Sequence, residues 1–177
     1  AVSLYPVVRK AKLPLNLKTQ PMFGKNQHLS IVDTALTKPK HMTPALAFAL
    51  GCIVTEGNIQ GNNIKVGNTN VVLLEKYTAC LVETFNFAPT VSLAYSKGSA
   101  GVVNGVSFSR NADFYLSVCS RSGIAEWVRE LGVGHHEGRK RGKTASYSKE
   151  VPWSVLQADV ESQLSFLAAF LVAFFID

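Results

Sequence analysis

Acidic residues are scarce in this sequence. The 177 residues include 12 Asp and Glu against 18 Lys and Arg, which gives a net charge of +6. The imbalance is greatest before Glu56, where Asp33 is the only acid. This balance indicates a polyanionic partner such as nucleic acid, with an incidental basic surface as the alternative. The basic residues of this N-terminal part are Arg9, Lys10, Lys12, Lys18, Lys25, Lys38 and Lys40.

Cysteine is also rare. Cys52, Cys80 and Cys119 are widely spaced and form no CxxC pair. A disulfide framework and a structural zinc site are therefore not expected, and a reducing compartment fits best. The first residues lack the charged start and apolar run of a secretory signal, so we expect an intracellular protein of the cytoplasm, an organelle matrix or a nucleoid, and not a secreted one.

No hydrophobic run is long enough to cross a membrane. The longest candidate, residues 164–176, has about 13 residues, whereas a bilayer crossing needs roughly 20. We therefore expect a buried helix there and no membrane partner. The hydrophobic content of 47% is sufficient for the core of one domain.

A helix is predicted to begin at Thr43, which can cap it, with Pro44 at the first helical position. The run Ala45–Val54 is apolar on all sides, so this helix must be buried on most of its surface. Ala47 and Gly51 lie four residues apart and make one face of the helix nearly flat, which allows another backbone to approach closely.

The rest of the chain alternates between strand and helix patterns, which predicts an α+β fold. A basic loop, 132–150, precedes the final apolar helix. The expected strands are 58–60, 64–68, 90–95, 102–110 and 114–119, and the expected further helices are 71–87 and 122–131.

Glu56 is the residue most suggestive of chemistry. It lies at the end of the apolar helix, directly before Gly57. A helix C-terminus is negative, so a carboxylate there needs a compensating cation, which a bound divalent metal would supply. The residues alone favour the plainer alternative, a solvent-exposed glutamate beside a capping glycine.

The segment Ala49–Gly57 resembles the LAGLIDADG motif of homing endonucleases, with Glu56 at the position of the final acid. The likeness extends over roughly residues 43 to 171. Further segments resemble, in order, the first hairpin, the following helix, the helix that closes the first half and the approach to the second motif helix. These segments are Asn58–Asn68, Leu73–Tyr77, Ile124–Gly132 and Lys149–Gln157.

The resemblance implies an αββαββ half-domain with a curved antiparallel sheet lying over the DNA major groove. Its two motif helices would pack through small residues, here Ala47 and Gly51 on the first and Ala169 and Ala173 on the second. It divides the chain into a basic irregular arm (1–41), a first half-domain with its basic loop (42–150) and the second motif helix (151–177), with the second half-domain missing.

The implied activity is site-specific, Mg²⁺-dependent hydrolysis of DNA, as in intein- or intron-encoded enzymes. Glu56, with Thr55, would hold the metal, and Arg121 would assist cleavage. The second motif departs from the family, because Phe174 takes the place of its acid in one register. In the other register the acid lies two residues beyond Asp177, so cleavage is expected to be incomplete unless Asp177 substitutes.

Sheet side chains and the basic loop are the candidates for DNA contact. Since strand residues alternate between faces, about half of the strand candidates must point away from the DNA. The candidates are Gln60, Asn62, Lys65, Asn68, Ser92, Tyr95, Lys97, Ser107, Ser109 and Arg110 on the sheet, and Arg139, Lys140, Arg141 and Lys143 in the loop.

Two other readings remain open. A non-cleaving module on the same fold, either an RNA maturase or a DNA-binding regulator, would explain the missing second acid. A structural α+β domain with incidental basicity would explain the charge. For the endonuclease and for the non-cleaving module, the expected partners are double-stranded DNA or RNA. A second copy of the chain, or a missing C-terminal half, would bind through the helices at 45–54 and 166–176.

Overall fold

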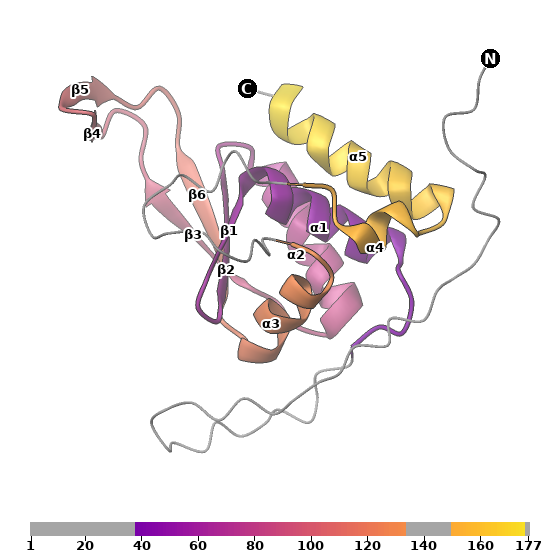
Figure 1. The fold of residues 1–177 in the computed structure, drawn as a ribbon. Coiled ribbons are helices and arrows are strands. Elements are labelled where there is room, and N and C mark those ends of the chain that lie inside the picture. Colours follow the sequence, from indigo (N-terminus) through magenta and orange to yellow (C-terminus); the bar gives the residue numbers. More distant parts are fainter. Residues whose placement is uncertain (1–37, 134–149, 176–177) are drawn as a thin grey trace, which may run out of the picture.

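A computed structural model describes residues 38–133 and 150–175 and shows a mixed α+β fold with an antiparallel sheet (Figure 1). Most of the predicted N-terminal arm and most of the predicted basic loop lie outside these ranges. The elements are α1 (Pro44–Glu56), β1 (Gly57–Gln60), β2 (Asn63–Asn68), α2 (Val71–Phe85), β3 (Thr90–Tyr95), β4 (Ala100–Val103), β5 (Val106–Ser109), β6 (Phe114–Cys119), α3 (Ser122–Glu130), α4 (Trp153–Leu156) and α5 (Val160–Phe175).

Helix α1 begins as predicted. The Thr43 hydroxyl oxygen accepts a hydrogen bond from the Leu46 backbone N–H at 3.2 Å, and Pro44 occupies the first turn. Every residue from Ala45 to Val54 is buried. The reason is its position, because α1 packs against β1 and β2 on one side, α2 on another and α5 on a third.

The main sheet has the strand order β1-β2-β6-β3, with all pairs antiparallel. Ile64, Val66, Ser117 and Cys119 are buried on the face that packs against the helices. In the described ranges, the helices lie on that side of the sheet (Figure 1). We call the opposite face the outer face.

The expectation of a single strand over residues 102–110 is wrong. Asn104 (φ 51°) and Gly105 (φ 81°) turn the chain back on itself, so β4 and β5 form a separate two-stranded hairpin. Two consecutive left-handed residues are the geometry of a tight hairpin turn, for which Asn-Gly is the preferred pair. The hairpin projects beyond the end of the main sheet (Figure 1).

Helix α5 begins earlier than the apolar run suggested. The Asp159 carboxylate accepts a hydrogen bond from the Ser162 backbone N–H at 2.9 Å, which satisfies the first turn. One face of α5 packs against α1, while Leu164, Leu167 and Leu171 on the other are about half exposed. None of the helices in the described part of the chain has both the length and the apolarity that a bilayer crossing requires.

Candidate functional site

Helices α1 and α5 approach each other at Gly51. A Cβ built on Gly51 would lie 2.7 Å from the Ala169 Cβ and 2.7 Å from the Phe166 carbonyl oxygen, so only glycine fits. Near the start of the pair, the Ser165 hydroxyl donates a hydrogen bond to the Pro44 carbonyl oxygen at 2.7 Å. Ala47 and Ala169 are fully buried and Ala173 is 8% exposed. The predicted close packing of the two helices through small residues is confirmed for Gly51 and Ala169.

The two helices run in the same direction. Contacts advance together along both chains, from Pro44 with Ser165 to Gly51 with Ala169. Their C-termini therefore lie at the same end of the pair (Figure 1). This packing occurs within one chain and buries Ala45–Val54, so that part of α1 is not available to the expected second copy or C-terminal half, whereas Leu164, Leu167 and Leu171 of α5 are about half exposed.

Glu56 lies at this shared end, with its side chain partly exposed. Gly57, which follows it, has an extended backbone (φ −94°, ψ 160°). Any residue can adopt this backbone, but only glycine fits the space, because a Cβ there would lie 2.6 Å from the Ile53 Cα. The tight passage from helix to strand thus holds Glu56 at the negative C-terminal end of α1, where a cation is favoured.

Thr55 is engaged in its own helix. Its hydroxyl donates a hydrogen bond to the Gly51 carbonyl oxygen at 2.9 Å, with the Cys52 carbonyl oxygen 3.3 Å away. The hydroxyl hydrogen is therefore used within the helix, in the bond to the carbonyl four residues earlier that threonine commonly makes. Within residues 38–133 and 150–175, no three His, Cys, Asp or Glu side chains are grouped to hold a metal ion. Asp177, the predicted substitute acid, lies outside the described residues.

Arg121 lies at the opposite end of the sheet from Glu56. Strand β1 starts beside Glu56, and β6 runs in the same direction as β1 because both are antiparallel to β2. Arg121 follows the end of β6, at the position before the first residue of α3, and its guanidinium lies 5.1 Å from the Phe87 ring centroid. Because Arg121 and Glu56 lie at opposite ends of the sheet, the prediction that Arg121 assists cleavage at Glu56 has no geometric support.

The register divides the predicted DNA-contacting residues between the faces. Four of the candidates lie on the outer face, because the strand register places them on the side opposite to the buried residues of β2 and β6. They are Gln60, Lys65, Ser92 and Tyr95. Asn68 is on the helix side instead. It is 8% exposed, and its side-chain oxygen accepts a hydrogen bond from the Asn70 backbone N–H at 2.7 Å, so it is corrected to a structural role.

Other candidates lie in turns or at the base of the β4–β5 hairpin. Asn62 is exposed in the turn between β1 and β2. Lys97 is exposed, and its backbone N–H donates to the Asp113 carboxylate at 2.6 Å. The Ser109 hydroxyl donates to the Gly98 carbonyl oxygen at 3.3 Å, and Ser107 is an exposed residue of β5. Arg139, Lys140, Arg141 and Lys143 lie outside the described residues.

Arg110 is the most extensively bonded of these candidates. Its guanidinium lies 4.0 Å from the Tyr95 ring centroid and 5.3 Å from the Phe108 ring centroid. Its Nη1 also donates a hydrogen bond to the Ala100 carbonyl oxygen at 2.6 Å. These contacts give Arg110 a structural role in joining the hairpin to the main sheet, beside its positive charge.

The sequence reasoning missed an apolar strip in the middle of the outer face. Phe114, Leu116 and Val118 of β6 alternate onto this face, and the Phe114 ring lies over Gly67. A Cβ at Gly67 would lie 2.8 Å from the Phe114 Cε1, so glycine is required beneath the ring. Gly67 within a strand pattern was the available signal, because an isolated strand glycine often marks close packing above it.

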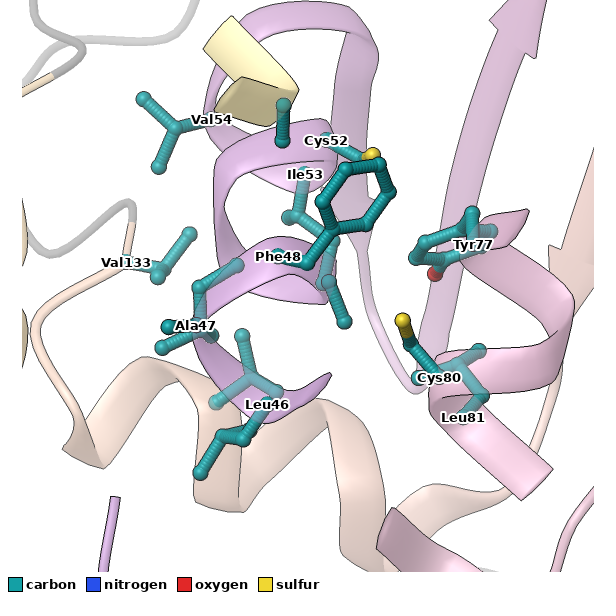
Figure 2. Packing of buried hydrophobic residues seen from close by; sticks show 14 of the residues in the cluster. Leu46, Ala47, Phe48, Cys52, Ile53, Val54, Tyr77, Cys80, Leu81 and Val133 are labelled. Atoms are coloured by element: carbon teal, nitrogen blue, oxygen red, sulfur yellow. The ribbon is translucent and has the colours of Figure 1, made fainter. Parts of the chain in front are cut away.

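The cysteines contribute no reactive group to this site. All three are free and buried. Figure 2 shows Cys52 and Cys80 beside Phe48 and Tyr77, in the apolar layer between α1 and α2. Burial raises the pKa of the Cys52 thiol far above its usual range, with Cys80 adding to the effect, and burial also raises the pKa of Cys80 and of Cys119. These thiols are therefore neutral side chains of the core.

Comparison of the sequence with models of known protein families gives no match, and comparison with curated proteins gives none either.

Proposed function

We propose that this protein binds double-stranded DNA on the outer face of its sheet and is a homing endonuclease of the LAGLIDADG type. The observation that carries the proposal is the pair of parallel, closely packed helices that ends at Glu56. Support also comes from the element order, in which a helix and two strands are followed by a helix and two further sheet strands, β3 and β6.

In this proposal Glu56 is the ligand of a divalent cation, with Mg²⁺ as the physiological ion. The fit rests on a hard carboxylate placed at the negative C-terminal end of α1. A bound metal would activate water and stabilise the leaving oxygen of a phosphodiester. Gly57 and the buried α1 fix the position of the carboxylate. The proposed chemistry requires a second carboxylate, for which Asp177, outside the described residues, is the candidate.

The second candidate function is DNA or RNA binding without cleavage. One observation favours it. The only acid of helix α5 is Glu161 in its first turn, at the far end of the helix pair from Glu56. Residues 160–175 therefore bring no second carboxylate to the site, and binding through the outer face does not need one.

Cleavage of a duplex selected from a random library, in the presence of Mg²⁺, tests the proposal. The Glu56→Gln variant should lose at least about a hundredfold of the cleavage rate, since even outer-shell partners of a metal contribute about 10- to 100-fold. Glu83→Gln, at an exposed position of α2, is the matched control and should cleave normally. Binding without cleavage by the wild type would leave the non-cleaving module as the function. Cleavage by Glu56→Gln at the wild-type rate would refute the assigned site.

A further inference from the structure

The β4–β5 hairpin continues the outer face of the main sheet. Phe114 lies on that face, with its ring centroid 6.0 Å from that of Tyr95. The Arg110 guanidinium lies 4.0 Å from the Tyr95 ring centroid and 5.3 Å from that of Phe108, a residue of β5. These four side chains form a stacked row, Phe114–Tyr95–Arg110–Phe108, which leads from the sheet onto one face of the hairpin.

Backbone hydrogen bonds fix the base of the hairpin. The Gly98 N–H donates to the Arg110 carbonyl oxygen at 2.8 Å, and the Arg110 N–H donates to the Ser99 carbonyl oxygen at 3.1 Å. A Cβ on Gly101 would lie 2.7 Å from the Phe108 Cε1 and 3.0 Å from the Arg110 Nη2. Glycine at this position therefore leaves room for the Phe108 ring and the Arg110 guanidinium on this face of the hairpin.

The tip of this face is apolar and exposed. The register pairs Val103 with Val106 next to the pair Gly101 and Phe108, which places Val103, Val106 and Phe108 on one face. Val103 is 57% exposed and Val106 is 68% exposed. Contiguous exposed apolar side chains of this kind mark an interaction surface.

Charge indicates which partner fits this surface. No acid occurs between Thr84 and Ala112, and the hairpin from Ala100 to Ser109 carries no charge. Lys97 and Arg110 lie at its base together with one acid, Asp113, whose carboxylate accepts a hydrogen bond from the Lys97 backbone N–H. An anionic partner can therefore approach along its whole length without repulsion, while the aliphatic tip requires an apolar group on that partner.

We propose that Val103 and Val106 enter the major groove of bound DNA and recognise the 5-methyl groups of thymine; this rests on the DNA binding proposed above. The major groove accommodates a two-stranded β-ribbon, and the thymine methyl is the group there that apolar side chains contact. The hairpin is thus a specificity element for thymine-containing steps at one end of the target.

The experiment compares a duplex selected from a random library with the same duplex in which deoxyuridine replaces thymidine. Deoxyuridine keeps the hydrogen bonds and removes only the methyl. The wild-type protein should bind the uracil duplex about fourfold more weakly for each methyl contacted, the factor that corresponds to burial of one methyl group. The double variant Val103→Ser/Val106→Ser should bind both duplexes equally. Val72→Ser, at another exposed valine on α2 that is 66% exposed, is the control and should keep the difference.

Equal binding of the two duplexes by the wild type would overturn the proposed recognition of thymine methyl groups while leaving the proposal of DNA binding intact. No binding of any duplex at low salt would overturn both proposals together. Retention of the thymine preference by the double variant would assign it to residues other than the hairpin. Binding of the wild type, but not of the double variant, to phosphatidylserine vesicles with no thymine preference would identify the hairpin as a membrane contact and would overturn the proposal.

Discussion

Gly51 sets the distance between the two helices that define the candidate site. The side chain it lacks would meet both the Cβ of Ala169 and the carbonyl oxygen of Phe166, each at 2.7 Å. Neither atom is the end of a flexible side chain, so accommodation would require α5 to shift. The position of Glu56 relative to the end of α5 depends on this contact, although Glu56 lies more than one helical turn away from it.

The Gly51→Ala variant is predicted to be destabilised, because adding a methyl to a packed interior forces backbone shifts that cost roughly 1–3 kcal/mol. The gain of about 1 kcal/mol that alanine brings over glycine within a helix offsets part of this cost, so the net loss should be up to about 2 kcal/mol. Urea unfolding followed by circular dichroism measures the change.

Adding Ala169→Gly to Gly51→Ala provides the control. It removes one of the two atoms that the new methyl meets, so part of the loss should be recovered, and the two substitutions should be non-additive. Strictly additive free energies of unfolding would show that the helices do not meet at this contact.

At the scale of elements, the helices were largely predictable, because their signals are local. Thr43, Pro44 and Gly57 gave the bounds of α1 from capping chemistry and from the need for a glycine. The start of α5 was placed too late, since the polar turn after Asp159 contains few apolar residues to mark it. The hairpin was missed because the valines and phenylalanine around Asn104 and Gly105 continue a strand pattern across the turn.

Which strand residues share a face could not be obtained from the sequence alone. Alternation fixes the faces of one strand relative to itself, but the pairing between strands is a long-range property. Alternation puts Lys65 and Asn68 of β2 on opposite faces, but only the register and the burial show that Asn68 is the one on the helix side. Arg121 was expected near Glu56 for the same reason, because only the strand directions show that the two lie at opposite ends.

The Arg110→Ala variant is predicted to loosen the hairpin without unfolding the protein. The substitution removes the stack against Tyr95 and Phe108 and the hydrogen bond to the Ala100 carbonyl oxygen. Exposed cation–π contacts contribute about 0.5–1 kcal/mol each, so the effect is local. Hydrogen exchange should become faster for residues 100–109, while the midpoint of global unfolding changes little.

Arg129→Ala is the matched control, because Arg129 also bonds a turn carbonyl, that of Gly61, but in the β1–β2 hairpin. Its faster exchange should be confined to that turn. Unchanged exchange over 100–109 in Arg110→Ala would mean that the backbone bonds alone hold the hairpin in place.

At the scale of the whole molecule, the question is whether the net charge of +6 acts through one face. The described lysines on the two sides of the sheet differ in their surroundings. Lys65 lies on the outer face beside Gln60 and the apolar strip of β6. Lys76 lies on the helix side, with its amino group 4.3 Å from the Phe48 ring centroid. Each could add to long-range attraction, but only one is placed to contact a phosphate of DNA on the outer face.

The salt dependence of duplex binding separates these two lysines. Affinity should fall linearly with the logarithm of salt concentration, with a slope of about −0.9 for each phosphate neutralised, because counterions are released at each contact. Lys65→Ala should lower the magnitude of that slope by about 1, and Lys76→Ala should leave it unchanged. Fluorescence anisotropy of a labelled duplex between about 50 and about 200 mM salt, the range over which such contacts weaken most visibly, measures both slopes. Equal effects of the two substitutions would mean that the charge acts diffusely, and a larger effect of Lys76→Ala would place the DNA on the helix side and not on the outer face.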